Sequence, residues 1–215
     1  MSPGEFFKTH HSSGEISKEL QKLDEETQLR WEVQTAHPAH SPGPVASDEM
    51  VCRPHTNPTH YDTSRKELKP TAFDDAADKG LSVDRLNVSS VEHSVAKARK
   101  RAEEFNTRRK EGAPHRTVFG HSVLAVASLR AIFTVKADGS SEPQRRGLGV
   151  YDTALEGEPE HADVCQIAPN RQGGRSARFQ LFQLGNAAHR LLDDDVTAAS
   201  AAAPADVGAA IVKTS

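Results

Sequence analysis

The sequence predicts an α+β fold: one core with a small mixed sheet and two or three packed helices, flanked by a disordered N-terminal linker and C-terminal tail. Three observations support this prediction. The 215 residues suffice for one ordinary domain. Stretches with apolar residues at helical spacing alternate with short stretches rich in valine, isoleucine and phenylalanine. Hydrophobic residues make up only 36% of the chain, so its ends lack the apolar surface needed to order themselves.

The chain divides into three predicted parts. Residues 1–47 hold an amphipathic helix and a linker rich in proline, which removes backbone donors and disfavours helix. Residues 48–192 form the core domain. Residues 193–215 are rich in alanine and offer few large side chains, so we expect a disordered tail.

The N-terminal helix is predicted from about Ser12 to Gln34. Ile16, Leu20 and Leu23 recur at spacings of four and three, with Glu and Lys residues between them. The apolar stripe is narrow, and we expect it to dock either on the core or on a partner.

Two core helices follow from the same spacing. Ser89 and Glu92 have the separation of a capping box, and the helix that they start should end near Lys110. The second helix spans 176–192. Short buried pieces and strands are expected at 50–53, 70–73, 80–83 and 161–168, with one or two strands at 117–135 and a long loop at 136–160.

Composition limits the cellular setting. The net charge of −3 gives no overall electrostatic case for a nucleic acid or a membrane. Two cysteines are too few for a disulfide scaffold, so we expect a reducing cytoplasm. The N-terminus lacks the basic and then apolar run of an export signal. No stretch is long and apolar enough to span a bilayer.

Metal binding is not predicted. Cys52, His55 and His60 have donors at spacings seen in zinc sites. Three donors are one short of a tetrahedral set, the sequence singles out no fourth, and the usual paired cysteines are missing. An ordinary loop is the preferred interpretation, and the sequence predicts no cofactor.

Arg53 and His55 stand near the end of a predicted strand. A guanidinium there can hold a phosphate or carboxylate with two hydrogen bonds, and an imidazole can exchange protons near neutral pH. The alternative is an arginine that closes the following loop by binding backbone carbonyls, beside an exposed histidine.

Ser82 and Asp84 flank Val83 and therefore share one side of a strand. They are candidate ligand-binding residues near Arg53. His161 and Asp163 show the same alternation, and His161 is a candidate catalytic acid or base with His55. A solvent-facing strand surface accounts equally for both pairs.

A basic stripe follows the helix that begins after Ser89. Lys97, Arg101 and Arg108 share one face. Three nearby glutamates dilute the charge, and no aromatic residues interleave with it to stack bases. A solvated helix face is therefore preferred over a nucleic-acid interface.

Short motifs occur along the core in the order Val51-Cys52-Arg53-Pro54-His55, Ala72-Phe73, Gly80-Leu81-Ser82-Val83-Asp84, Val123-Leu124-Ala125-Val126 and Pro159-Glu160-His161-Ala162. On these motifs, about half of the chain resembles a family of small, functionally uncharacterised bacterial proteins. The resemblance implies a compact cytoplasmic α/β domain with Arg53, His55, Ser82 and His161 near one cleft, and it implies no established reaction. The chain departs from the family at Asp163, where an apolar residue is usual.

Two functions are predicted. The first is a cytoplasmic interaction or accessory protein, of a bacterial mobile-element or defence operon, that binds a protein partner through its N-terminal helix. Its support is the absence of a complete catalytic motif. The alternative is an enzyme acting on a nucleotide or NAD-like ligand, loosely similar to ADP-ribosyl-transferring folds. There Arg53 holds a phosphate, His55 or His161 moves a proton, and Ser82 orients the substrate.

Overall fold

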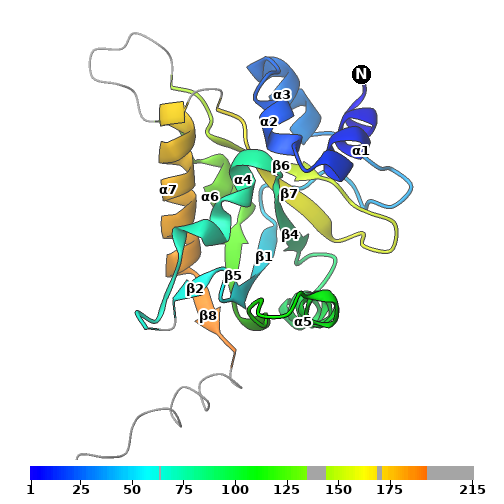
Figure 1. Ribbon diagram of the computed structural model, residues 1–215. Coiled ribbons are helices and arrows are strands. Elements are labelled where there is room, and N and C mark those ends of the chain that lie inside the picture. The colour runs from blue at the N-terminus through cyan, green and yellow to red at the C-terminus, as the bar shows by residue number, and fades with distance from the viewer. Residues whose placement is uncertain (63, 135–143, 169–170, 193–215) are drawn as a thin grey trace, which may run out of the picture.

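A six-stranded sheet with helices on both faces organises the computed structural model, which describes residues 1–62, 64–134, 144–168 and 171–192 (Figure 1). The predicted α+β class is confirmed. The sheet differs from the expected mixed one, since each neighbouring pair of strands runs antiparallel. An isolated bridge between Thr35 and Asp152 is parallel.

The strands of the main sheet follow the order β6-β7-β4-β1-β5-β8. Neighbouring strands therefore come from distant parts of the sequence, and β1 pairs with β5 along its whole length, from Met50 to Asn57. A separate two-stranded sheet joins β2 and β3. The bounds are β1 Met50–Asn57, β2 Tyr61–Asp62, β3 Glu67–Leu68, β4 Leu81–Arg85, β5 Thr117–Ala125, β6 Leu148–Asp152, β7 His161–Gln166 and β8 His189–Leu191.

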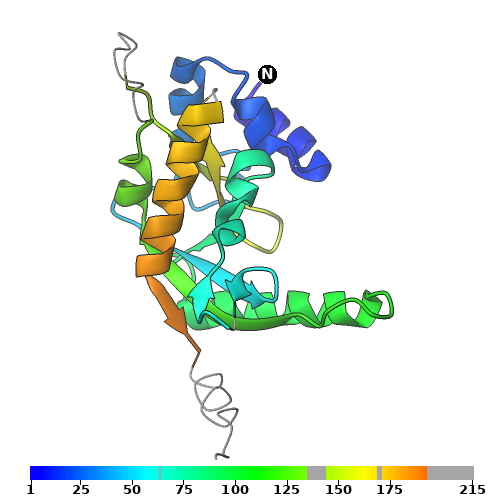
Figure 2. The same ribbon diagram turned by 60° about the vertical axis from the view of Figure 1, so that its left-hand side comes forward.

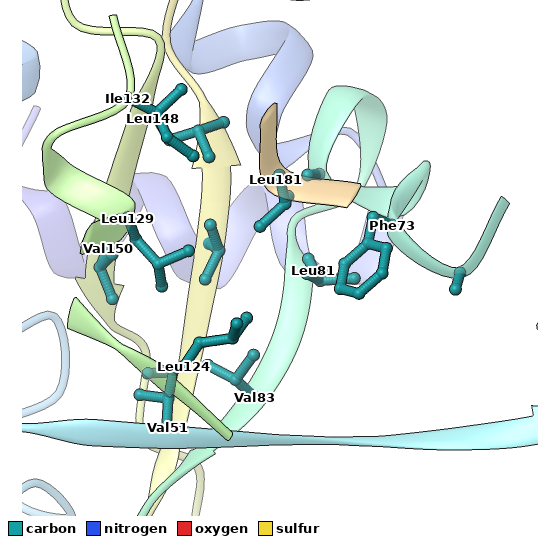
Figure 3. Close-up of a cluster of buried hydrophobic side chains, with 14 of the residues drawn as sticks. Val51, Phe73, Leu81, Val83, Leu124, Leu129, Ile132, Leu148, Val150 and Leu181 are labelled. Atoms are coloured by element: carbon teal, nitrogen blue, oxygen red, sulfur yellow. The ribbon is translucent and has the colours of Figure 1, made fainter. Parts of the chain in front are cut away.

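One face of the sheet carries the larger apolar core (Figure 3). Alternate residues of β4, β6 and β7 point to it, together with residues of β1 and β5, and α6 (Val126–Arg130) and α7 (Arg171–Ala187) cover it. Gly185 of α7 lets that helix approach Phe73, at the end of the short helix Pro70–Phe73, because a Cβ there would lie 2.0 Å from the Phe73 ring. Buried members include Val51, Leu81, Val83, Leu124, Leu129, Leu148, Val150, Val164 and Leu181.

The opposite face is covered in two separate places. Three N-terminal helices pack over β6 and β7, where Phe6, Phe7 and Trp31 form a buried cluster with Tyr151 and other residues. The long helix α5 (Val91–Arg108) packs over β1 and β5, in a second cluster of Val95, Ala102 and Val118. The stretch of β4 and β7 between these two clusters carries polar side chains instead.

The N-terminal segment differs from the single helix predicted from Ser12 to Gln34. It forms α1 (Pro3–Ser13), α2 (Ile16–Leu20) and α3 (Glu25–Glu32). Gly14 ends α1 with a φ of 67°, in the left-handed region that favours glycine. The carboxylate of Asp24 caps α3 by accepting from the Thr27 N–H. The apolar stripe docks on the core, which was one of the two expectations.

The proline-rich segment from 36 to 48 contains no helix or strand but is packed, whereas a disordered linker was expected. Val45 is 3% exposed within the main core. Buried Arg85 donates to the carbonyls of Gly43 and Pro44, at 2.6 and 3.3 Å. The backbone carbonyls of this irregular segment are thus hydrogen-bonded by a side chain of the sheet. Composition alone does not reveal such a contact.

Several core elements match the sequence analysis. Helix α5 and strand β7 are confirmed, although Ser90 rather than Ser89 caps α5. The described residues of the stretch 117–135, which end at 134, hold one strand and α6, and β6 lies inside the expected long loop. The piece at 70–73 is the short helix η1 (Pro70–Phe73), followed by α4 (Asp75–Asp78). The helix predicted at 176–192 is α7, which starts earlier and gives way to β8.

The predicted tail at 193–215 lies outside the described residues. Among the helices that the structure describes, none has the length and apolar character needed to cross a membrane.

Candidate functional site

A cavity of about 380 Å³ opens where β1 and β4 separate. The two strands pair at Val51 with Arg85 and at Cys52 with Asp84, after which β1 continues beside β5. Helix α5 closes one side of the opening. The lining side chains are mostly polar: Arg53, Pro54, Thr56, Thr59, His60, Thr71, Asp75, Lys79, Ser82, Asp84, Ser94, Lys97, Ala98, Arg101, Ala102, Arg116 and His161.

Arg53 lies in the gap between the two strands. Its side chain is 12% exposed, and Nη1 donates to the carbonyl of Ser82 at 2.9 Å. The carboxylate of Asp75 lies 3.9 Å from Nη2, and Nε is buried with no hydrogen-bond partner among the described residues. Burial lowers the pKa of the guanidinium, with Asp75 opposing, but an arginine keeps its charge at neutral pH. Arg53 is therefore a buried cation with unused donor capacity.

Lys97 and Arg101 on α5 are held by carboxylates. The Lys97 ammonium binds Asp84, Glu158 at 3.2 Å and Glu160 at 2.7 Å. Arg101 binds Glu158 with Nη2 at 2.6 Å. Burial lowers the pKa of Lys97, but its contacts with Asp84 and Glu160 outweigh this and raise it. The acidic loop before β7 thus positions these two cations at the cavity wall and offsets much of their charge.

The polar strip on β4 and β7 supplies the other wall. Ser82 pairs with Asp163 and Asp84 with His161, so the antiparallel register brings all four side chains to one face. Asp163 Oδ2 lies 3.5 Å from His161 Nε2 and accepts from the Thr153 hydroxyl at 2.8 Å. The Ser82 hydroxyl donates to Asp163 at 3.4 Å.

His161 and Asp163 form an ion pair when the imidazole is protonated. Burial lowers the pKa of His161, but the charge of Asp163 outweighs it, so the pKa is raised above its usual 6.5. Burial raises the pKa of Asp163, but the contacts with His161 and the Thr153 hydroxyl outweigh burial, so this pKa is lowered overall. The carboxylate therefore stays ionised, and its charge favours the protonated form of His161 at the cavity wall.

His55 does not line the cavity. It is fully buried on the opposite face, where its ring lies 5.6 Å from that of Phe73. The Ser122 hydroxyl donates to the carbonyl of Gly185 at 2.7 Å, so at 2.8 Å it accepts from His55 Nε2–H. Burial and then the charge of Arg53 lower the pKa of His55 to about 2. The predicted catalytic histidine is a neutral core residue.

Four of the five predicted site residues therefore meet: Arg53, Ser82, Asp84 and His161. His60, considered in the sequence only as a metal donor, also lines the cavity. Its Nδ1 accepts from the Thr56 N–H at 3.1 Å, which leaves the hydrogen on Nε2. Burial and Arg53 lower its pKa to about 3. The Asn-Pro dipeptide at 57–58, a turn signal, could have indicated that the chain reverses there.

The three potential zinc donors are not arranged around an ion. In the described part of the chain no group of three or more His, Cys, Asp or Glu side chains is placed to hold a metal. Burial raises the pKa of the Cys52 thiol to about 12, which opposes the thiolate form that metals bind.

No protein-family model matches this chain, and no curated protein or solved structure matches it.

Proposed function

We propose that this protein binds a small phosphate-bearing molecule of the nucleotide class in the cavity, with Arg53 contacting the phosphate. The supporting observation is the unbalanced charge of Arg53. A buried guanidinium normally has a close carboxylate partner, and this one has Asp75 at 3.9 Å and a free Nε. The planar donor fork of arginine matches phosphate oxygens well.

The remainder of the wall favours the same ligand. Five cationic side chains line the cavity, and Glu158 and Glu160 offset much of the charge of two of them, Lys97 and Arg101. Arg53 is held less closely, with its nearest carboxylate at 3.9 Å. The volume of about 380 Å³ falls within the range of small-molecule sites. Few apolar side chains line it, which disfavours an uncharged hydrophobic ligand. Nucleotides are abundant in the cytoplasm, the compartment that the sequence predicts.

His161 adds a group that can move a proton at the bound ligand. Its Nε2 lies 3.5 Å from Asp163 Oδ2, and its pKa is raised by that carboxylate. This supports the prediction of an enzyme acting on a nucleotide or NAD-like ligand. ADP-ribosyl transfer in particular has less support, because that reaction would need a free catalytic glutamate. The two glutamates nearest the cavity, Glu158 and Glu160, are both paired with Lys97.

The accessory function also has less support. It relies on an N-terminal helix whose apolar side is free for a partner, and Phe6, Phe7 and Trp31 are each less than 7% exposed.

Calorimetric titration of the full chain with AMP, ADP, NAD⁺ and inorganic phosphate tests this proposal. We expect Arg53→Gln to weaken binding of the best probe by about 10- to 100-fold, the effect of losing a charge-assisted contact. Arg53→Lys keeps the charge without the fork and should give an intermediate loss. Lys8→Gln, on an exposed part of α1, is the matched control and should bind as the parent does.

Arg53→Gln also removes a contact to Ser82, so thermal unfolding of each variant must accompany the titration. A folded Arg53→Gln protein that binds every probe as tightly as the parent overturns the proposal. So does a parent protein that binds none of the four probes.

A further inference from the structure

The face of α5 that lines the cavity extends along the helix beyond the cavity. Lys97, Arg101, Phe105 and Arg108 follow one another at spacings of four, four and three, so they form one row along the helix. Lys97 and Arg101 line the cavity, and the next two residues lie farther along the same row. Figure 2 shows α5 and the chain leading into β5 reaching away from the rest of the molecule as an arm.

Positive charge is concentrated on this arm. Residues 97–116 contain eight lysines and arginines and three glutamates, whereas the whole chain has a net charge of −3. The arm is therefore cationic on an otherwise acidic protein. Its excess positive charge lies toward Arg108 and Lys110, because Glu158 and Glu160 pair with Lys97, and Glu158 also with Arg101, at the cavity end. One of the glutamates, Glu104, stands in the same row and is exposed.

An aromatic and guanidinium pair stands where the cavity meets the arm. The guanidinium carbon of Arg116 lies 3.5 Å from the centre of the Phe105 ring, and Phe105 is 36% exposed. Asn106 holds the backbone of Arg116 from both sides, accepting from its N–H and donating to its carbonyl, both at 2.8 Å. Arg116 also lines the cavity. Guanidinium planes and aromatic rings are the surfaces on which unpaired bases stack.

We infer that the ligand of the cavity is one nucleotide of a single-stranded nucleic acid, whose backbone continues along α5 toward Arg108 and Lys110. This rests on the proposed function and names its ligand class. Phosphates along the arm would face cations, and a base next to the cavity would meet Phe105 and Arg116. The sequence alone did not favour nucleic acid because it did not bring Arg116 onto Phe105.

Fluorescence anisotropy of the full chain with labelled oligouridylate and oligothymidylate of about ten nucleotides tests this inference. UMP and TMP serve as competitors. We expect the oligomers to bind about tenfold or more tightly than the mononucleotides, with an affinity that falls as salt rises. The RNA and DNA arms show which sugar is preferred, and tighter binding of either oligomer supports the inference.

Charge variants separate the arm from the cavity. Arg108→Glu should weaken oligomer binding about tenfold and leave mononucleotide binding unchanged. Glu104→Gln should tighten oligomer binding about twofold, because it removes a negative charge that repels the phosphates of the oligomer. Lys8→Glu makes the same charge change as Arg108→Glu at an exposed site on α1, and should leave oligomer binding near that of the parent.

The outcomes distinguish this inference from the function on which it rests. Mononucleotides that bind as tightly as the oligomers overturn the inference and leave the proposed function standing. If Arg53→Gln leaves the affinity for the oligomers unchanged, the cavity does not hold part of the bound strand, and the inference is overturned. Equal binding to polyglutamate, or to vesicles of phosphatidylcholine with phosphatidylserine, shows unspecific charge attraction and also overturns it. A chain that binds neither mononucleotide nor oligomer contradicts the proposed function itself.

Discussion

Two buried histidines of the same sheet, His55 and His161, differ in the direction in which their surroundings shift the pKa. His55 on β1 is 0% exposed and His161 on β7 is 2% exposed, so burial hardly distinguishes them. Aromatic rings and Ser122 surround His55, and its pKa falls to about 2. A carboxylate lies beside His161, and its pKa is raised. A neighbouring charge, more than depth, therefore decides whether the pKa of a buried histidine is lowered or raised.

Acidification should give the largest effect. The folded pKa values of His55 and His60, about 2 and about 3, lie below the ordinary 6.5, so the unfolded chain takes up protons first. Their stabilising effect is present above pH 6.5 and is lost as the pH falls toward the folded values. From about pH 7.5 to about pH 5, the contribution of these two histidines to the free energy of unfolding should fall by roughly 4 kcal/mol. Urea unfolding across this range measures it.

His161 acts in the opposite sense. Its folded pKa is raised, so its stabilising effect is complete below pH 6.5 and is lost as the pH rises through the folded value. His55→Phe, which keeps an aromatic ring among aromatic neighbours, should remove about half of the acid-induced loss. A parent protein equally stable at both ends of the range would contradict this account of His55.

Asp163→Asn should give the second largest effect. The change removes the charge that raises the pKa of His161, so we expect that pKa to fall below 6.5. Breaking a buried ion pair by removing one partner should lower the free energy of unfolding by about 3 kcal/mol. NMR titration of the histidines and urea unfolding measure the two quantities. Asp78→Asn, at an exposed carboxylate of α4, is the control. A His161 pKa that stays raised in Asp163→Asn excludes this role for the carboxylate.

Ser122→Ala tests the other region. It leaves His55 Nε2–H without its acceptor and the Gly185 carbonyl without its donor. We expect a loss of about 2 kcal/mol in the free energy of unfolding. Ligand affinity should not change, because His55 lies outside the cavity. Should Ser122→Ala weaken AMP binding as much as Arg53→Gln, the separation of the two regions would be wrong.

Ser82→Ala should give the smallest effect. The Ser82 hydroxyl donates to Asp163 over a long 3.4 Å, and Asp163 keeps its contacts with Thr153 and His161. The expected loss in the free energy of unfolding is about 0.5 kcal/mol, measured by urea unfolding. A loss as large as that of Asp163→Asn would mean that Ser82, rather than His161, is the main partner of the carboxylate.

The sequence analysis failed where contacts between distant segments decide the structure. Pro70–Phe73 is a short buried piece, as predicted, but its 3₁₀ helical form and the contact of Phe73 with Gly185 of α7 were not predicted. The segment at 36–48 has the composition of a linker, but its carbonyls bind Arg85. Such partners are separated by tens of residues or more, so no local pattern identifies them.

Local periodicity by itself determined helix α5, strand β7 and the shared side of Ser82 and Asp84, because a helix or strand repeats every few residues along the chain. The sequence analysis also expected Arg53 and His55 to act together near the end of a strand, and here the tertiary structure separates them. Since β4 leaves β1 after Cys52, the Arg53 side chain enters the gap and reaches the cavity, while His55 lies under Phe73. Which strand ends where, and what covers each face, depends on packing between distant segments rather than on spacing.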